Sequence, residues 1–227
     1  PVATVAVDKT GAENAGLLAA QCLGVYEAET ALKVKAYINS RKKSPAPVSA
    51  ESSTNDLSAA LIGAEGADVE LLQRSGKILA ELGVDHEYFQ VHPLQDPDQF
   101  QSLTEKLESH GCKVAICASG TSASLAAAVS SRFSGPVVGV PVASTPLAGV
   151  DALLSCIQTP AGIPVATVAI GPMGAKNAGI LAGQILAGGD SKLFTALAQY
   201  RKGVETGLIK EADALMQTLD EAHRAKI

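Results

Sequence analysis

The first 24 residues of the chain recur, with few changes, close to its other end. The segment PVATVAVDKTGAENAGLLAAQCLG, which starts at Pro1, returns at Pro164 as PVATVAIGPMGAKNAGILAGQILA. The offset is 163 residues, 15 of the first 23 positions are identical, and the alignment continues without a gap to Tyr37 and Tyr200. Solenoid repeats have periods of at most about 50 residues, whereas a domain commonly reaches about 150. The repeat therefore predicts two tandem copies of one domain.

The position of the repeat divides the chain into four parts. We expect residues 1–43 to be the C-terminal strand and helices of a first copy, with a buried strand at Val2–Val7, and residues 56–206 to be a complete second copy. Residues 44–55 are rich in Pro, Ser and Ala and predict a linker, and residues 207–227 predict a C-terminal helical extension. In this interpretation the remainder of the first copy is absent from the sequence. The alternative, which stays open, is that residues 1–43 pack on the complete copy as an added strand and helix.

Within the complete copy, apolar runs alternate with amphipathic segments. The runs predict strands at residues 58–62, 88–91, 113–118, 136–142 and 165–170. The amphipathic segments predict helices at 69–82, from Pro97 with Asp96 as its cap, from about 121, at 150–158 and at 174–186. Such alternation is typical of an α/β fold in which helices cover both faces of a parallel sheet.

Ligands of these folds bind beyond the carboxyl ends of the strands. The loops expected to form a site are therefore those at 63–68, 92–96, 118–124 and 143–149. Residues 191–227 predict one or two amphipathic helices, which either cover the domain or pack on a neighbouring subunit.

Composition and charge exclude several classes of protein. The net charge of −5 argues against a nucleic-acid partner, because such a partner requires a basic surface. No apolar run reaches the roughly 18 residues needed to cross a membrane, so membrane insertion is not expected. The four cysteines form no C-x-x-C pair and have mostly apolar neighbours, which indicates reduced, buried thiols in an intracellular, reducing compartment and no zinc site.

Residues 135–187 carry four distinctive motifs: GVPV, L-x-GVD-x-L-x-S, Q-x-P-x-G-x-PVATVAI and GA-x-NA-x-x-LA-x-QIL. In these motifs the chain resembles the family of aminoimidazole ribonucleotide carboxylases and carboxyaminoimidazole ribonucleotide mutases of purine biosynthesis. The resemblance implies a three-layer, flavodoxin-like sandwich that assembles as an octamer. It also implies an imidazole ribonucleotide ligand whose carboxylate is moved to or removed from ring carbon 4, with no metal and no organic cofactor. The family's general acid/base is a His in an S-A-H-R loop.

The three ligand loops that this family carries are all altered here. The first, G-S-x-S-D in the family, reads GAEGAD and keeps only Gly63 and Asp68. In the second, the position of the catalytic His is Leu94 and that of the phosphate-side Arg is Gln95. In the third, a second His of the family is replaced by Ser124. Leucine cannot transfer a proton, and glutamine lacks the charge and the bidentate geometry of arginine, so we expect the complete copy to be inactive.

Several residues still have the chemistry of a site. His92 lies two positions before Leu94 and is either a relocated acid/base or a solvent-facing loop residue. Asp68 is either the family's ribose ligand or an N-cap for the helix that follows. Ser119, Gly120 and Thr121 belong to a run, 119–124, that could bind a phosphate through backbone N–H groups and hydroxyls, or could merely cap a helix. Asn14 and Asn177 are equivalent in the repeat, and for both we expect a capping or turn role.

Three functional hypotheses follow from these observations. In the first, the parent protein is a tandem carboxylase or mutase whose catalytic centre lies in the first copy or between copies, and the complete copy is structural. In the second, catalysis has been lost altogether and the protein is a scaffold or interaction subunit of a larger complex. In the third, the complete copy is active and uses His92. The expected partners are accordingly an imidazole ribonucleotide and other family domains, in a homo-oligomer or in the first copy.

Overall fold

The structure, a computed structural model, describes residues 1–40, 57–120 and 124–224. The predicted linker at 44–55 and the candidate ligand Thr121 lie outside the described residues. The strands are β1 (Ala59–Gly63), β2 (His86–Gln90), β3 (Val114–Ser119), β4 (Val137–Pro141) and β5 (Ala166–Thr167). The α-helices are α1 (Asp8–Gly24), α2 (Ala28–Ser40), α3 (Gly66–Glu81), α4 (Pro97–Ser109), α5 (Ser124–Ser130), α6 (Val150–Ile157), α7 (Gly171–Leu186) and α8 (Ser191–Arg224), and a 3-10 turn, η1, spans Ala187–Gly189.

The five strands form one parallel sheet in the order β2-β1-β3-β4-β5. This order reverses direction between β1 and β3, which is the arrangement of flavodoxin-like folds. In the sheet, Gly63 at the end of β1 lies between Gln90 of β2 and Ala118 of β3. The predicted three-layer α/β fold, with additional helix at the C-terminus, is confirmed.

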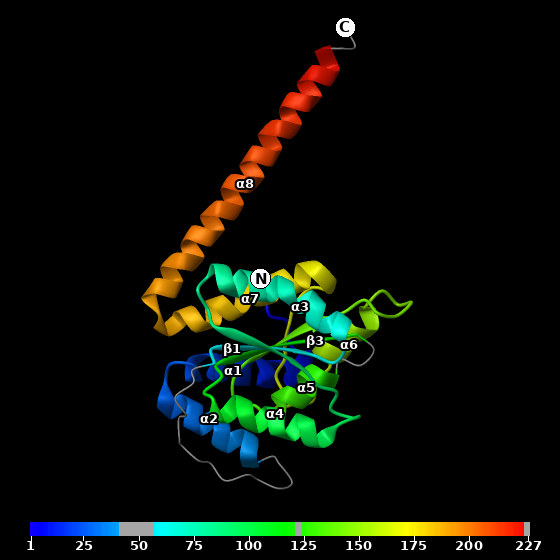
Figure 1. Cartoon of the computed structure of the whole chain (residues 1–227). Coiled ribbons are helices and arrows are strands. Elements are labelled where there is room, and N and C mark those ends of the chain that lie inside the picture. Colours follow the sequence, from blue (N-terminus) through cyan, green and yellow to red (C-terminus); the bar gives the residue numbers. More distant parts are fainter. Residues whose placement is uncertain (41–56, 121–123, 225–227) are drawn as a thin grey trace.

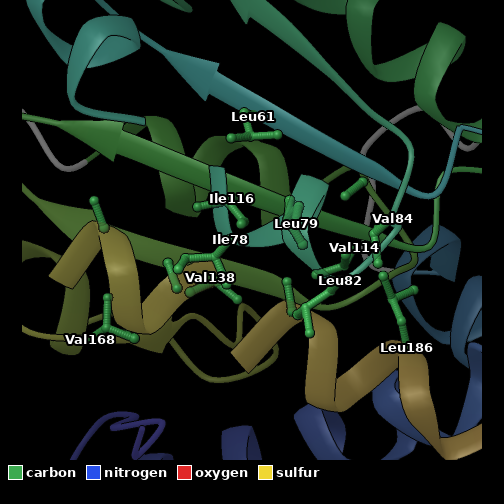
Figure 2. Close-up of a cluster of buried hydrophobic side chains, with 14 of the residues drawn as sticks. Leu61, Ile78, Leu79, Leu82, Val84, Val114, Ile116, Val138, Val168 and Leu186 are labelled. Atoms are coloured by element: carbon green, nitrogen blue, oxygen red, sulfur yellow. The ribbon is translucent and has the colours of Figure 1, made fainter. Parts of the chain in front are cut away.

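Two apolar cores cover the two faces of the sheet. Because side chains alternate along a strand, Leu61 of β1 and Ile116 of β3 enter the core beneath α3 and α7, whereas Ile62 enters the core beneath α4 and α5. Figure 1 shows these two pairs of helices on opposite sides of the sheet, and Figure 2 shows how the first core fills the space between strands and helices. The aliphatic composition of the chain suits this close packing of helix on sheet.

Residues 1–40 pack against the rest of the chain. Leu18 of α1 belongs to the core beneath α3 and α7, and Lys35 of α2 forms a 2.9 Å ion pair with Glu108 of α4. The predicted buried strand at Val2–Val7 is wrong, because Val2 and Val7 are 79% and 74% exposed. One antiparallel bridge, between Thr4 and Thr167, joins this segment to the edge strand β5.

α8 is a single helix of 34 residues that projects away from the body of the molecule (Figure 1). Its first turns are anchored, since Leu193 and Leu197 are buried against the core. Further along, apolar side chains are exposed: Val204, Leu208, Ile209, Leu215 and Met216. The helix runs without interruption through residue 206, where the complete copy was expected to end. Among the described residues, no helix is long and apolar enough to cross a membrane.

Candidate functional site

The carboxyl ends of four strands meet at one edge of the sheet, as the pattern of strands predicts. The N–H of Val91 donates to the carbonyl of Gly63 at 3.0 Å, and the N–H of Val142 donates to the carbonyl of Ser119 at 3.2 Å. The residues after β1, β2, β3 and β4 therefore start side by side. This edge contains Gly63, Ser119 and Gly120, and His92 follows directly after Val91.

Gly63 and Asp68 form a closely packed turn between β1 and α3. A Cβ atom on Gly63 would lie 2.7 Å from Val69 Cγ2 and 2.8 Å from its backbone nitrogen, so the turn has room only for glycine. Asp68 is 4% exposed, and its Oδ2 accepts a 3.1 Å hydrogen bond from the N–H of Glu65. α3 begins at Gly66, which makes Asp68 the third residue of the helix and not its N-cap.

This contact defines what Asp68 does in the described structure. Its carboxylate satisfies a backbone donor at the helix start, which is the reciprocal half of a capping box. Burial raises the pKa of the carboxyl group above its usual value, although hydrogen bonds from backbone N–H groups of Glu65 and Ala64 act in the opposite direction. The expected N-cap role was wrong in position but right in kind, and a ribose-binding role remains a prediction.

The loop between β2 and α4 carries the positions where the resemblance expects the catalytic His and the Arg. The carbonyl of His92 accepts hydrogen bonds from the N–H groups of Gln95 (3.1 Å) and Asp96 (3.0 Å), which close a tight turn. Leu94 is 76% exposed, and Gln95 is exposed as well. Asp96 caps α4 by accepting a 2.8 Å hydrogen bond from the N–H of Gln99, as predicted.

His92 itself is half-buried, so the interpretation as a solvent-facing loop residue is only partly right. Its Nδ1 is buried and has no hydrogen-bond partner among the described residues. An unpaired ring nitrogen of this kind keeps a free position for a proton or a ligand atom. His92 therefore has the chemistry of a candidate acid/base, without any residue that orients it.

The loops after β3 and β4 lie against each other. Ser119 and Gly120 are buried, and a Cβ atom on Gly120 would collide with the side chain of Ser144. In the second loop, Thr145 Oγ1 donates to Asp151 Oδ2 at 3.0 Å, while Oδ1 of Asp151 is buried without a partner. The sequence analysis missed Ser144 and Asp151 as site residues. The GVD motif, which contains Asp151, is the signal that could have indicated one of them.

Other kinds of site find no support in the described part of the chain. No group of three or more His, Cys, Asp or Glu residues there could hold a metal ion. All four cysteines are free, and burial raises the pKa of Cys22 to about 11 and that of Cys112 and of Cys156 to about 12. The pKa of Cys117 is raised for the same reason. Neutral thiols are poor nucleophiles, so none of the four has the properties of a catalytic cysteine.

Asn14 makes a contact that its expected capping or turn role does not include. It lies in the interior of α1, is fully buried, and binds the loop before β5. Its Nδ2 donates to Thr159 Oγ1 at 3.3 Å and to the carbonyl of Pro160 at 3.2 Å, and its Oδ1 accepts from the N–H of Gly162 at 2.8 Å. The expected role was therefore wrong for Asn14, which instead joins residues 1–40 to the complete copy.

The fold and the residues at this edge define a flavodoxin-like ribonucleotide-enzyme scaffold, and comparison with known proteins identifies which one. The family model for AIR carboxylase matches residues 59–206, and the chain belongs to this family. The chain is 40% identical over 154 residues to N5-carboxyaminoimidazole ribonucleotide mutase of Haemophilus influenzae, covering 68% of this chain and 94% of the relative. The enzyme of the same name from Escherichia coli K12 is 37% identical over 162 residues, covering 71% and 96%.

Two further comparisons concern arrangement and fold. A bifunctional purine synthesis protein purC/E of Dictyostelium discoideum is 38% identical over 151 residues, which are 66% of this chain and 14% of that protein. In that protein the domain is thus one part of a longer polypeptide. The crystal structure of Treponema denticola PurE superposes with a TM-score of 0.63 at 21% identity, covering 69% of this chain and 97% of that one. This likeness supports the shared fold.

Proposed function

We propose that this chain belongs to a tandem-domain protein of imidazole ribonucleotide carboxylation or carboxylate transfer, in which residues 59–206 form a non-catalytic copy. Family membership gives the pathway, purine biosynthesis. The observation that carries the proposal is the loop at residues 92–96. Leu94 occupies the position of the expected catalytic His, and its side chain points to solvent.

The chemistry of the family explains why this replacement is decisive. Moving a carboxylate onto or off an imidazole carbon requires a proton to be added to or removed from that carbon. A positioned acid/base typically contributes about 10²–10⁴-fold to such a step. Leu94 cannot supply it, and Gln95 offers no positive charge to a phosphate. By contrast, the residues that build the sheet and its cores are those of a complete fold.

The internal repeat supports a tandem organisation in which residues 1–43 end a first copy. α1 and α2 start at Asp8 and Ala28, and α7 and α8 start at Gly171 and Ser191, so both pairs are separated by the same 163 residues as the sequence repeat. The packing of residues 1–40 on the complete copy is compatible with this organisation, because adjacent domains of one polypeptide commonly share an interface.

Activity through His92 is a second candidate function, favoured by the unpaired Nδ1 of this residue. Interconversion of the two carboxylated aminoimidazole ribonucleotides by the purified chain separates the two. We expect no turnover above the uncatalysed rate. Turnover that disappears in His92→Asn, while the variant keeps the melting temperature of the parent, would instead establish His92 as the acid/base and contradict the proposal.

A scaffold role is favoured by one further observation, the exposed apolar side chains along the outer part of α8. Contiguous exposed apolar surface is characteristic of interaction sites. Size-exclusion chromatography with light scattering tests this role. A self-contained homo-oligomer argues for an assembly of family domains, whereas a monomer that associates only with other proteins argues for the scaffold.

A further inference from the structure

The two copies of the repeat contact each other at equivalent positions. Thr4 and Thr167 are separated by the repeat offset of 163 residues, and each donates its backbone N–H to the other's carbonyl, at 3.0 and 2.8 Å. A contact in which a residue meets its own equivalent is the property of a two-fold interface. Residues 1–40 and the region around β5 and α7 are therefore related by a local pseudo-two-fold axis that passes near this pair.

The same relation holds at the far ends of the two helices. Tyr26, just after α1, packs on Gly188 and Gly189, just after α7. Cys22 and Ile185, which are again 163 residues apart, border one cleft together. Contacts at both ends of α1 and α7 thus agree with a single axis.

A two-fold axis requires each contact to occur twice, and one contact occurs only once. Asn14 of α1 is fully buried and holds the loop at Thr159–Gly162 with three hydrogen bonds. Its equivalent, Asn177 of α7, is only half-buried, and within the described part of the chain its side chain makes no hydrogen bond. The loop that Asn177 would hold is the one that ends immediately before the strand segment at Pro1–Val7.

From this asymmetry we propose that Asn177 and the surrounding face of α7 bind the Thr-Pro-x-Gly loop of the first family domain, whose last part is residues 1–43. This inference rests on the tandem organisation proposed above. The occupant is a second copy of the same fold, docked about the axis that Thr4 and Thr167 define. Asn177 Nδ2 then donates to the loop's hydroxyl and proline carbonyl, and Oδ1 accepts from the N–H of the loop's glycine, as Asn14 does.

Pro1 supports the direction of this docking. It borders the cleft formed with Leu181 and Gln184, which lie one and two turns along α7 from Asn177. A chain that leads into Pro1 therefore approaches along the helix that carries the unpaired amide. Gln184 itself has a buried Oε1 without a partner, a further polar group on this helix that is not satisfied in the described chain.

The proposal is tested by supplying the missing loop. A longer chain repeats residues 57–163 directly before Pro1, so that Ile163 joins Pro1 just as it joins Pro164. Asn177→Ala and, as the matched control, Asn14→Ala are introduced into the original and the longer chain, and melting temperatures are measured. We expect Asn14→Ala to lower the melting temperature by about 4–10 °C in both chains, because three buried hydrogen bonds are lost.

Asn177→Ala separates the outcomes. We expect a change below about 1 °C in the original chain and a decrease close to that of Asn14→Ala in the longer chain. An equally small effect in both chains overturns the proposal. The result does not depend on catalysis, so it is distinct from the turnover assay, which tests the proposed function.

A shorter extension keeps the test decisive if the longer chain does not fold. The sequence of residues 158–163 is placed before Pro1, and the side-chain NH₂ signals of Asn177 are followed by NMR, which detects even a partly populated docked state. We expect these signals to shift, and to remain unshifted when valine replaces the glycine that corresponds to Gly162. Gly162 has a φ of 85°, a conformation that valine strongly disfavours. Identical Asn177 signals with both extensions would overturn the proposal.

Discussion

At the scale of single residues, the turn at 92–96 has the greatest consequence for chemistry. His92 closes the turn through its carbonyl, which fixes the backbone and leaves the side chains of Leu94 and Gln95 in solvent. The turn keeps a regular hydrogen-bonded form although the residues expected to perform chemistry have changed. Selection for structure and selection for catalysis therefore act on different atoms of the same loop.

Asp68 allows the two roles of a carboxylate to be separated by mutation. Asp68→Ala removes the acceptor for the Glu65 N–H and should destabilise the chain by about 0.5–2 kcal/mol, as loss of a cap does. Asp68→Asn keeps an acceptor oxygen and removes the cost of a buried charge, so its stability should stay within about 0.5 kcal/mol of the parent. Urea unfolding at pH 7 measures both. Equal destabilisation by the two variants would contradict the capping role.

At the scale of helices and strands, α8 divides into an anchored and an exposed part. Leu197 is 6% exposed and packs on the core, whereas Leu208, on the same helix, is 61% exposed. Leu197→Ala should cost about 2–4 kcal/mol through the lost contacts and the cavity left behind. Leu208→Ala should cost less than about 0.5 kcal/mol. Chemical unfolding at low protein concentration compares the pair, and a cost above 1 kcal/mol for Leu208→Ala would show that the outer part of α8 is packed against another surface.

Most elements could be predicted from the sequence because burial on two faces leaves a simple pattern. The strands at 59–63 and 114–119 are continuous apolar runs, and Asp96 and Pro97 mark the start of α4 unambiguously. The strand expected at Val2–Val7 failed, because a run of valines forms a strand only beside a neighbour, and β5 offers it a single bridge. For the same reason β5 is two residues long and not six.

The site could be predicted less completely. Its location at Gly63, His92, Ser119 and Gly120 follows from the topology, since the ends of parallel strands share one edge. The capping contact of Asp68 and the hydrogen bonds of Asn14 depend on residues that are brought close only by the tertiary fold. A single sequence contains no periodicity that reports such contacts.

At the scale of the whole molecule, the buried thiols link stability to pH. Burial raises the pKa of all four cysteines above the usual value near 9. Between the unfolded and the folded pKa, the unfolded chain has lost a proton that the folded chain retains, so stability falls as pH rises above about 9 and is unaffected by the thiols below it. Each fully buried thiol contributes at most about 1.4 kcal/mol per pH unit.

Cys117→Ala isolates this effect from other groups that titrate in the same range. Urea unfolding of the parent and the variant at pH 8 and pH 10 gives the decrease in stability for each. We expect a smaller decrease in the variant, because one buried thiol no longer titrates in the unfolded state. An identical decrease in the two proteins would show that Cys117 ionises equally well when folded.

The whole molecule combines a complete scaffold with altered ligand loops, and ligand binding tests this combination most directly. The measurement is a calorimetric titration of the chain with N5-carboxyaminoimidazole ribonucleotide. The account predicts no detectable heat at millimolar ligand, since neither the phosphate-side charge nor the acid/base of the expected site is present. Binding with a micromolar dissociation constant would contradict it, by showing that the loops around Gly63, His92 and Ser119 still form a working ribonucleotide site.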